Sequence, residues 1–148
     1  MWQLEGFESV AAKVATVTGM NTPEAGQFGQ DAEQRLVWQG KDRYFWLTDA
    51  KEVAAVDGLY ATDQSQSKTQ LQISGADARA LLARGLPVEL DEQAFAIGEV
   101  KMTHINHIGV SVLRMPDVDS QPMFELWVMR GFAVSLMEFL TESAATLR

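Results

Sequence analysis

The order of strand and helix patterns after residue 59 constrains the fold of this chain more than any other feature. Alternating or β-branched runs predict strands near Leu59–Thr62, Thr69–Ser74, Val100–Asn106, Gly109–Met115 and Met123–Met129. A helical pattern lies between the second and third of these strands, and a longer helix begins near Gly131. Two strands, a helix, three strands and a helix predict an α+β fold with a mainly antiparallel sheet and flanking helices.

The helix between the strands lies in the stretch "LQISGADARALLARGLPVEL", residues 71–90. Ser74 and Asp77 have the spacing of a capping box, in which the two side chains bind the first free amides of the helix. The apolar face comprises Ala78, Leu81 and Leu82. Gly85 predicts a left-handed stop, and Pro87 prevents the helix from continuing. Since the polar residues are assigned to capping, the stretch indicates architecture and not a phosphate-binding loop.

The N-terminal third of the chain predicts a helix followed by a hairpin. The helical face comprises Phe7, Val10, Val14 and Val17, and the helix ends near Gly19. The runs "RLVWQ" and "RYFWLT" flank the turn "GKD" and predict two paired strands. In the second strand Tyr44 and Trp46 face one side, and Phe45 and Leu47 face the other. A strand that is apolar on both faces is covered on both sides, by helices, another layer or a partner.

Composition bounds the class of protein. The 148 residues fit one domain, 1–148, with an ordinary hydrophobic core. The absence of Cys excludes disulfides and thiolate catalysis. A net charge of −8 argues against nucleic acid as a partner, because phosphate contacts need a surplus of Lys and Arg. The longest apolar run, "FAVSLMEFL", is too short for a bilayer, and "MWQLEGFESV" has no signal-peptide pattern, so we expect a cytoplasmic protein without membrane association.

Candidate catalytic groups are few, and each has a structural interpretation. His104 and His107 lie three apart on a predicted strand, so they point to opposite faces and do not share a metal. Ser111 in "GVSVL" lies inside a strand and lacks the second glycine of a nucleophile elbow. The segment "PDVDSQ" has the alternating acids of a calcium loop without its glycine or distal glutamate, and predicts a hairpin loop. We therefore expect no catalytic, cofactor-binding or metal-binding residue in this chain.

Two tryptophans are candidates for a partner interface. Trp46 and Trp127 lie on strands that carry large apolar side chains on both faces. Tryptophan is enriched at the centres of protein interfaces. The alternative is that a second layer of the same chain covers them.

A series of motifs runs in order along the second half of the chain: Ser74-Gly75, Ala78-Arg79, Gly85-Leu86-Pro87 and Glu89-Leu90, then Phe95 and Gly98, and then "FELWVMRGFAVSLMEFL". In their order and spacing they resemble the gamma subunit of heterotetrameric sarcosine oxidase, a relative of the folate-binding domain of aminomethyltransferases. The segments "TGMNTPEAGQF" and "RLVWQGKDRYFWLT" extend the resemblance over nearly the whole chain. The chain departs from the family pattern at Leu86, where Cys is common, at Asp91, where His is common, and at Gly131, where Ser is usual.

The resemblance implies a structural role in a larger enzyme. Such a complex demethylates sarcosine oxidatively to glycine, releases hydrogen peroxide and passes the one-carbon unit to tetrahydrofolate. The resemblance implies that this chain is a non-catalytic subunit with an aminomethyltransferase-like fold. It also implies that FAD, FMN, NAD and tetrahydrofolate are held chiefly by alpha and beta subunits, and zinc by a delta subunit. The alternatives are a stand-alone folate-binding or aminomethyltransferase-like protein, and the equivalent subunit of a related N-methyl amino acid dehydrogenase.

Overall fold

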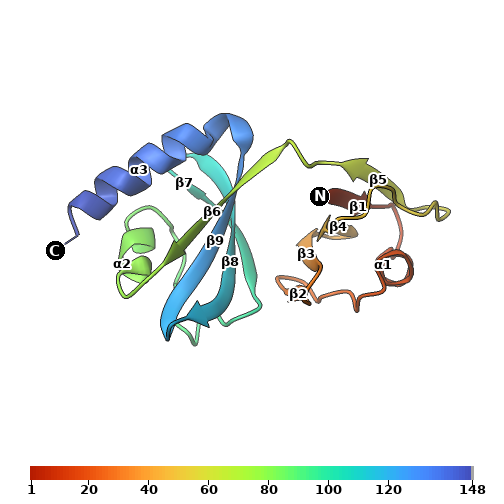
Figure 1. Cartoon of the computed structure of the whole chain (residues 1–148), viewed down its shortest axis with the longest axis horizontal. Helices are drawn as coiled ribbons and strands as arrows, with labels where there is room; N and C mark the ends of the chain where they lie inside the picture. Colours follow the sequence, from red (N-terminus) through yellow and green to blue (C-terminus); the bar gives the residue numbers. More distant parts are fainter. Residues whose placement is uncertain (148) are drawn as a thin grey trace. The chain divides into compact units, whose positions relative to one another are not determined.

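The computed structural model describes residues 1–147 and has a mixed α+β architecture, with two antiparallel sheets and few helices (Figure 1). The chain divides into two compact units, Met1–Ser65 and the segment from Gln66 onward. The α+β class expected from the sequence is confirmed at this level. The assignment of residues 1–148 to a single domain stays a prediction.

The first unit holds a five-stranded antiparallel sheet in the order β2-β3-β4-β1-β5. Its elements are β1 (Trp2–Glu5), α1 (Ala11–Thr18), β2 (Phe28–Gln30), β3 (Arg35–Gly40), β4 (Arg43–Leu47) and β5 (Tyr60–Asp63). Strand β1 lies between β4 and β5 and pairs antiparallel with both. The strand at the N-terminus therefore joins two segments that are distant from it in sequence.

The predicted hairpin around "GKD" is confirmed, since β3 and β4 pair antiparallel across that turn. Asp42 takes a φ of 54° in the turn, and its carboxylate accepts the Val10 N–H at 3.1 Å. The turn residue thus also fixes the segment that leads into α1. On β4, a strand expected to be covered on both faces, the buried side chains are Tyr44, Phe45 and Trp46.

Helix α1 is shorter than its sequence pattern predicts. It begins at Ala11, and Phe7 precedes it with 88% of its surface exposed, so the placement of Phe7 on the buried helical face is wrong. The chain bends in this segment, and Gly6 before the bend packs closely against Gly58, since a Cβ on Gly6 would lie 2.6 Å from the Gly58 carbonyl oxygen. The other end is as predicted, with Gly19 in the left-handed conformation at a φ of 71°.

The core of the first unit lies between α1 and its sheet. Its buried members are Leu4, Val10, Val14, Leu36, Tyr44 and Trp46. Partly buried Trp2 packs against this cluster and donates its indole N–H to the Ala50 carbonyl at 3.1 Å. The hydrogen bond holds the loop after β4 against the core.

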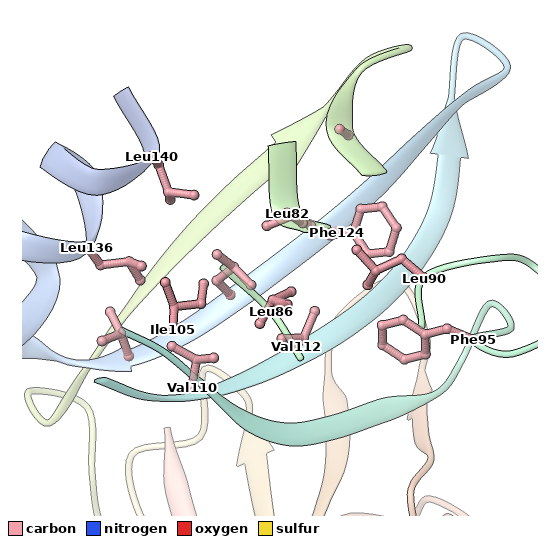
Figure 2. Packing of buried hydrophobic residues seen from close by; sticks show 13 residues of the cluster. Leu82, Leu86, Leu90, Phe95, Ile105, Val110, Val112, Phe124, Leu136 and Leu140 are labelled. Carbon is pink, nitrogen blue, oxygen red and sulfur yellow. The ribbon is translucent and has the colours of Figure 1, made fainter. Parts of the chain in front are cut away.

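The second unit holds a four-stranded antiparallel sheet in the order β6-β9-β8-β7. Its elements are β6 (Lys68–Ser74), α2 (Ala78–Ala83), β7 (Val100–Ile105), β8 (Ile108–Val118), β9 (Gln121–Met129), the 3-10 turn η1 (Arg130–Phe132) and α3 (Ala133–Ala145). Helices α2 and α3 pack on one face of this sheet (Figure 2). The alternation along each strand sorts its side chains between this face and the opposite one.

The core of the second unit forms between the helices and that face (Figure 2). The helices α2 and α3 and the segment after α2 contribute Leu82, Leu86, Leu90, Leu136 and Leu140. The central strands β8 and β9 contribute Val110, Val112, Phe124, Leu126 and Val128. Burying one such side chain stabilises the fold by roughly 1.5–3 kcal/mol. On the last helix Leu136 and Leu140 face the core, whereas Phe132 precedes the helix in η1 and is half exposed.

The start of α2 differs from the predicted capping box. Ser74 is the last residue of β6 and pairs with Met123, and the helix begins at Ala78 without a side-chain cap. Gly75, at a φ of 120°, makes the turn between strand and helix and donates its N–H to the Pro122 carbonyl at 3.2 Å. Because three residues separate the strand from the helix, the Ser74 side chain is not available as the cap.

Gly85 follows the end of α2, and the physical reason for a glycine at this position differs from the one predicted. Its backbone is outside the left-handed region, so the expected left-handed stop is wrong. A Cβ at this position would lie 2.7 Å from Phe139 Cε1 and 2.9 Å from Ile105 Cγ2. Glycine is therefore needed for space, where the end of α2 approaches α3 and β7.

Two tight turns connect the three long strands. Asn106 and His107 join β7 to β8 with φ values of 45° and 70°, and Asp119 and Ser120 join β8 to β9 with φ values of 50° and 60°. Two consecutive positive φ values match the type I′ turn that suits the twist of a hairpin. The hairpin predicted at "PDVDSQ" is confirmed, but its loop is shorter than expected, because β8 continues through Val118 and β9 begins at Gln121.

Candidate functional site

The two histidines do not form a joint site. His104 lies on β7, exposed, while His107 lies in the turn after it. The placement of His107 on a strand is therefore wrong, because the hairpin reverses at Asn106 and His107. Among the described residues no group of three His, Cys, Asp or Glu side chains is arranged to hold a metal ion.

Ser111 lies inside β8, as predicted, and pairs with Met102 on β7 and with Trp127 on β9. Its side chain is buried. A serine at this place contributes to the packing of a central strand, and it has no strand-to-helix turn to present it to a substrate.

Both candidate interface tryptophans are buried in this chain. Trp46 packs in the core of the first unit and donates its indole N–H to Gln34 Oε1 at 2.8 Å. Trp127 lies on the sheet face opposite α2 and α3, and its indole N–H donates to Glu125 Oε1 at 2.5 Å. Their assignment to a partner interface stays a prediction, and the exposed apolar side chains are found elsewhere.

Arg114 is a deeply buried cation of the second unit, with 1% of its side chain exposed. It follows Val110 and Val112 on the helix-facing side of β8, where an apolar residue is expected. Its guanidinium donates to Asp117 Oδ1 at 2.6 Å and to the Met115 carbonyl at 2.5 Å. The same group lies over the ring of Phe124, 5.3 Å from the centroid.

The position of Arg114 explains these contacts. The register of β8 against β9 shifts between Met115 and Val118, so carbonyls near this point leave the regular ladder. Arg114 supplies hydrogen bonds to two of them, those of Met115 and Met123. The Asp117 carboxylate compensates its charge. The sequence signal for this cluster is a cation at an inward position of an otherwise apolar strand.

A cavity of about 390 Å³ opens beside this cluster, lined by Glu92, Ala96, Ile97, Arg114 and Asp117. Its two carboxylates outnumber its one cation, which already forms an ion pair with Asp117. The electrostatics of this cavity therefore oppose an anionic ligand. We interpret the arginine as a support for the β8–β9 bulge.

A neighbouring cavity of about 470 Å³ is lined by Arg79, Asp91, Glu92 and Gln93. Arg79 on α2 donates to the Leu90 carbonyl at 3.0 Å and to Glu92 Oε1 at 3.1 Å. The glutamate is largely exposed, so this ion pair stabilises the unit by less than about 1 kcal/mol. Through these two contacts Arg79 holds the loop after α2 against the helix.

A third cavity, of about 570 Å³, lies in the first unit and is lined by Ala32, Glu33, Gln34, Thr48, Asp49 and Ala50. Gln34 organises its wall, since its side chain contacts Trp46 and donates to Asp31 Oδ2 at 3.3 Å. Backbone hydrogen bonds from Glu33 and Gln34 lower the pKa of the Asp31 carboxyl below 3.8. These contacts fix the loop before β3.

Exposed apolar side chains gather at two places. In the first unit Phe7, 88% exposed, meets Tyr60, 54% exposed, in an edge-to-face contact with ring centroids 5.8 Å apart. In the second unit the exposed side chains at the start of the last helix are Met129, Phe132, Val134 and Met137. The helices of the described residues are too short or too polar to cross a lipid bilayer.

Comparison with solved structures finds a similar fold in a chain of the heterotetrameric sarcosine oxidase from Corynebacterium sp. U-96, in complex with pyrrole 2-carboxylate. The TM-score is 0.81 at 17% sequence identity, and the match covers 97% of this chain and 78% of that chain. At this identity the likeness establishes the fold. No protein-family description matches the sequence, and a search of curated proteins finds no match.

Proposed function

We propose that this chain is a non-catalytic structural subunit of a heterotetrameric sarcosine oxidase, equivalent to its gamma subunit. The observation that carries the proposal is the structural similarity over 97% of the chain to a protein that is itself a heterotetrameric complex. The motif order in the sequence supports the same family independently, because it rests on residue types and the fold comparison rests on backbone geometry.

In this proposal the partner subunits are the alpha, beta and delta chains, which hold FAD, FMN, NAD, tetrahydrofolate and zinc, and the complex is cytoplasmic. The contribution of this chain is to bind and position the larger subunits. The polar groups described above support this role, because each makes contacts within the chain. Arg114 stabilises the β8–β9 bulge, Arg79 holds the loop after α2, and Gln34 holds the loop before β3. Exposed apolar side chains such as Phe7 and Tyr60 provide surface for docking.

The test is co-expression with the candidate alpha, beta and delta subunits from the same organism. Size-exclusion chromatography and sarcosine-dependent formation of hydrogen peroxide are measured with and without this chain. The expected result is co-elution, with assembly or activity lost when the chain is omitted. A lone peak for this chain, with full activity in its absence, contradicts the proposal.

Point variants test the non-catalytic part of the proposal. His104→Ala and Ser111→Ala remove the groups best suited to proton transfer or nucleophilic attack. If the chain is structural, the assembled complex keeps its turnover number with either variant. A large loss of turnover without a loss of assembly assigns catalysis to this chain and refutes the structural role.

The same preparation separates the alternatives. A stand-alone folate-binding protein is stabilised by tetrahydrofolate, by about 2.7 kcal/mol when the ligand concentration is 100 times its Kd. We expect no shift of melting temperature for the isolated chain. Activity of the complex with N-methylglutamate in place of sarcosine identifies the related N-methyl amino acid dehydrogenase.

A further inference from the structure

We propose that the free edge of β5 is the docking site for an extended, basic segment of a partner subunit, which adds as a further strand to the first sheet. This inference rests on the proposed function, since the segment belongs to a subunit of the complex. It names the surface and the chemistry of the contact.

The topology leaves β5 half paired. In the strand order β2-β3-β4-β1-β5, β5 is at the end of the sheet, and within the described residues β1 is its only paired neighbour (Figure 1). An edge strand presents a row of backbone N–H and C=O groups with the spacing that an extended chain requires. The backbone of β5 therefore specifies the conformation of its occupant.

The side chains of β5 leave this edge accessible. All four residues from Tyr60 to Asp63 are exposed, so both faces of the strand are open. Asp63 is the only charged residue of the strand, and its carboxylate accepts hydrogen bonds from the Ser65 N–H and hydroxyl. By contrast, the edge strands of the second sheet carry the residue that most often protects an edge, Lys68 in β6 and Lys101 in β7.

An aromatic pair marks the end of this edge. Tyr60 pairs across the sheet with Glu5, and Phe7 follows β1 by two residues. Phe7 and Tyr60 stand edge to face on the surface while most of the Phe7 ring is exposed. Exposed aromatic rings beside an open strand edge are suited to pack on an apolar side chain of an added strand, which supplies specificity beyond the backbone pairing.

Charge selects a basic partner segment over a second copy of this chain. The chain carries a net charge of −8, so two copies repel each other. Within residues 52–67, which include β5, the charged residues are Glu52, Asp57 and Asp63, and all of them are acidic. A segment with Lys or Arg beside its apolar anchor complements this edge and gains association rate from the attraction.

The experiment measures hydrogen exchange of this chain, free and in the complex co-expressed with the alpha, beta and delta subunits. In an antiparallel strand alternate amides point to opposite sides. Two of the four β5 amides therefore exchange rapidly in the free chain, and we expect them to become protected in the complex. A complex that assembles while these amides exchange as fast as in the free chain overturns the inference and leaves the proposed function intact.

Charge-matched variants test the side-chain part of the contact. Tyr60→Lys and Tyr60→Glu remove the same ring and differ in sign, and Val134→Lys, at a 70% exposed position of the second unit, is the control. We expect Tyr60→Lys to weaken assembly at least about tenfold, Tyr60→Glu to weaken it less, and Val134→Lys to have no effect. Equal losses with Lys and Glu, or a loss with the control alone, overturn the assignment.

Two further outcomes identify other occupants. If the free chain is a dimer in light scattering with its β5 amides already protected, the edge pairs with a second copy and the inference fails. If no partner subunit co-elutes with the unmodified chain, the proposed function fails, and the inference fails with it.

Discussion

The substitution Gly85→Ala tests the packing of the second unit most sharply. Its added Cβ would lie 2.7 Å from Phe139 Cε1 and 2.9 Å from Ile105 Cγ2, whereas carbon atoms prefer separations of about 3.5–4.0 Å. The Phe139 ring is partly buried and can yield, but Ile105 is 1% exposed and packed in the core. One extra methyl in such a place lowers stability by about 1–3 kcal/mol.

An opposing effect reduces this loss. Because Gly85 is outside the left-handed region, alanine suits its backbone and stabilises the protein by about 0.4–1 kcal/mol through the unfolded state. Taking the middle of each range, we therefore expect a net loss of about 1.3 kcal/mol. The assay is urea unfolding followed by hydrogen exchange of the β8 and β9 amides, which reports on the second unit. The matched control is Gly131→Ala, whose Cβ would meet no atom within 4 Å and leaves stability unchanged or raised.

The double variant Gly85→Ala/Phe139→Leu separates the two explanations of this glycine. If the contact with the Phe139 ring is the cause, the two losses are less than additive by at least about 0.5 kcal/mol. If Gly85 instead provides a left-handed stop, alanine destabilises the unit and Phe139→Leu gives no rescue. A Gly85→Ala protein as stable as the Gly131→Ala control refutes the steric argument.

Three other perturbations have defined outcomes. Arg114→Met removes the hydrogen bonds at the β8–β9 bulge and lowers the stability of the second unit by about 1–3 kcal/mol in urea unfolding. The loss stays within this range because Asp117 is 38% exposed and its carboxylate remains hydrated. A larger loss contradicts that account. The lowered pKa of Asp31 contributes stability at pH values above 3.8 that is lost as pH falls through its folded-state pKa, and an NMR titration midpoint at or above 3.8 contradicts this. His107→Gly relieves a non-glycine residue at a φ of 70° and raises the thermal stability by up to about 1 kcal/mol, whereas a loss argues that the imidazole makes a stabilising contact.

The strands of the second unit could be predicted from the sequence because alternation persists along them. Phe124, Leu126 and Val128 face the helices, and Trp127 faces the other way, as the period of two requires. The ends of these strands were predicted less well. Turns such as Asn106-His107 use positive φ values at residues other than glycine, which composition does not mark.

The ends of α2 illustrate how tertiary structure overrides local signals. Ser74 has the residue type and spacing of a helix cap, but pairing with β9 claims its backbone for the sheet. Gly85 stands where a left-handed stop is expected, but the close approach of Phe139, which leaves no room for a Cβ, explains the glycine instead. In both cases the partner is distant in sequence, so a local pattern cannot reveal it.

The prediction of site residues meets the same difficulty, because residue type alone does not reveal the environment of a side chain. The frequency of tryptophan at interfaces predicts such a role for Trp46 and Trp127, yet tryptophan is also frequent in cores, and both indoles are buried here. The burial of Arg114 is not evident from the sequence, because a charged residue in a strand is ordinarily interpreted as solvent-facing. Its position in phase with Val110 and Val112 was the available signal.

The edge at β5 shows why an interface of this kind depends on topology. The sequence of residues Tyr60 to Asp63 does not say whether the strand is central or at an edge. Among the described residues, the strand order places β5 at the end of the sheet, so that β1 pairs with one of its sides and the other stays unpaired. Its binding capacity comes from backbone groups that every residue except proline carries. A docking site built on such groups is therefore invisible to a search for characteristic side chains, and the exposed pair Phe7 and Tyr60 is the part of it that the amino-acid sequence encodes directly.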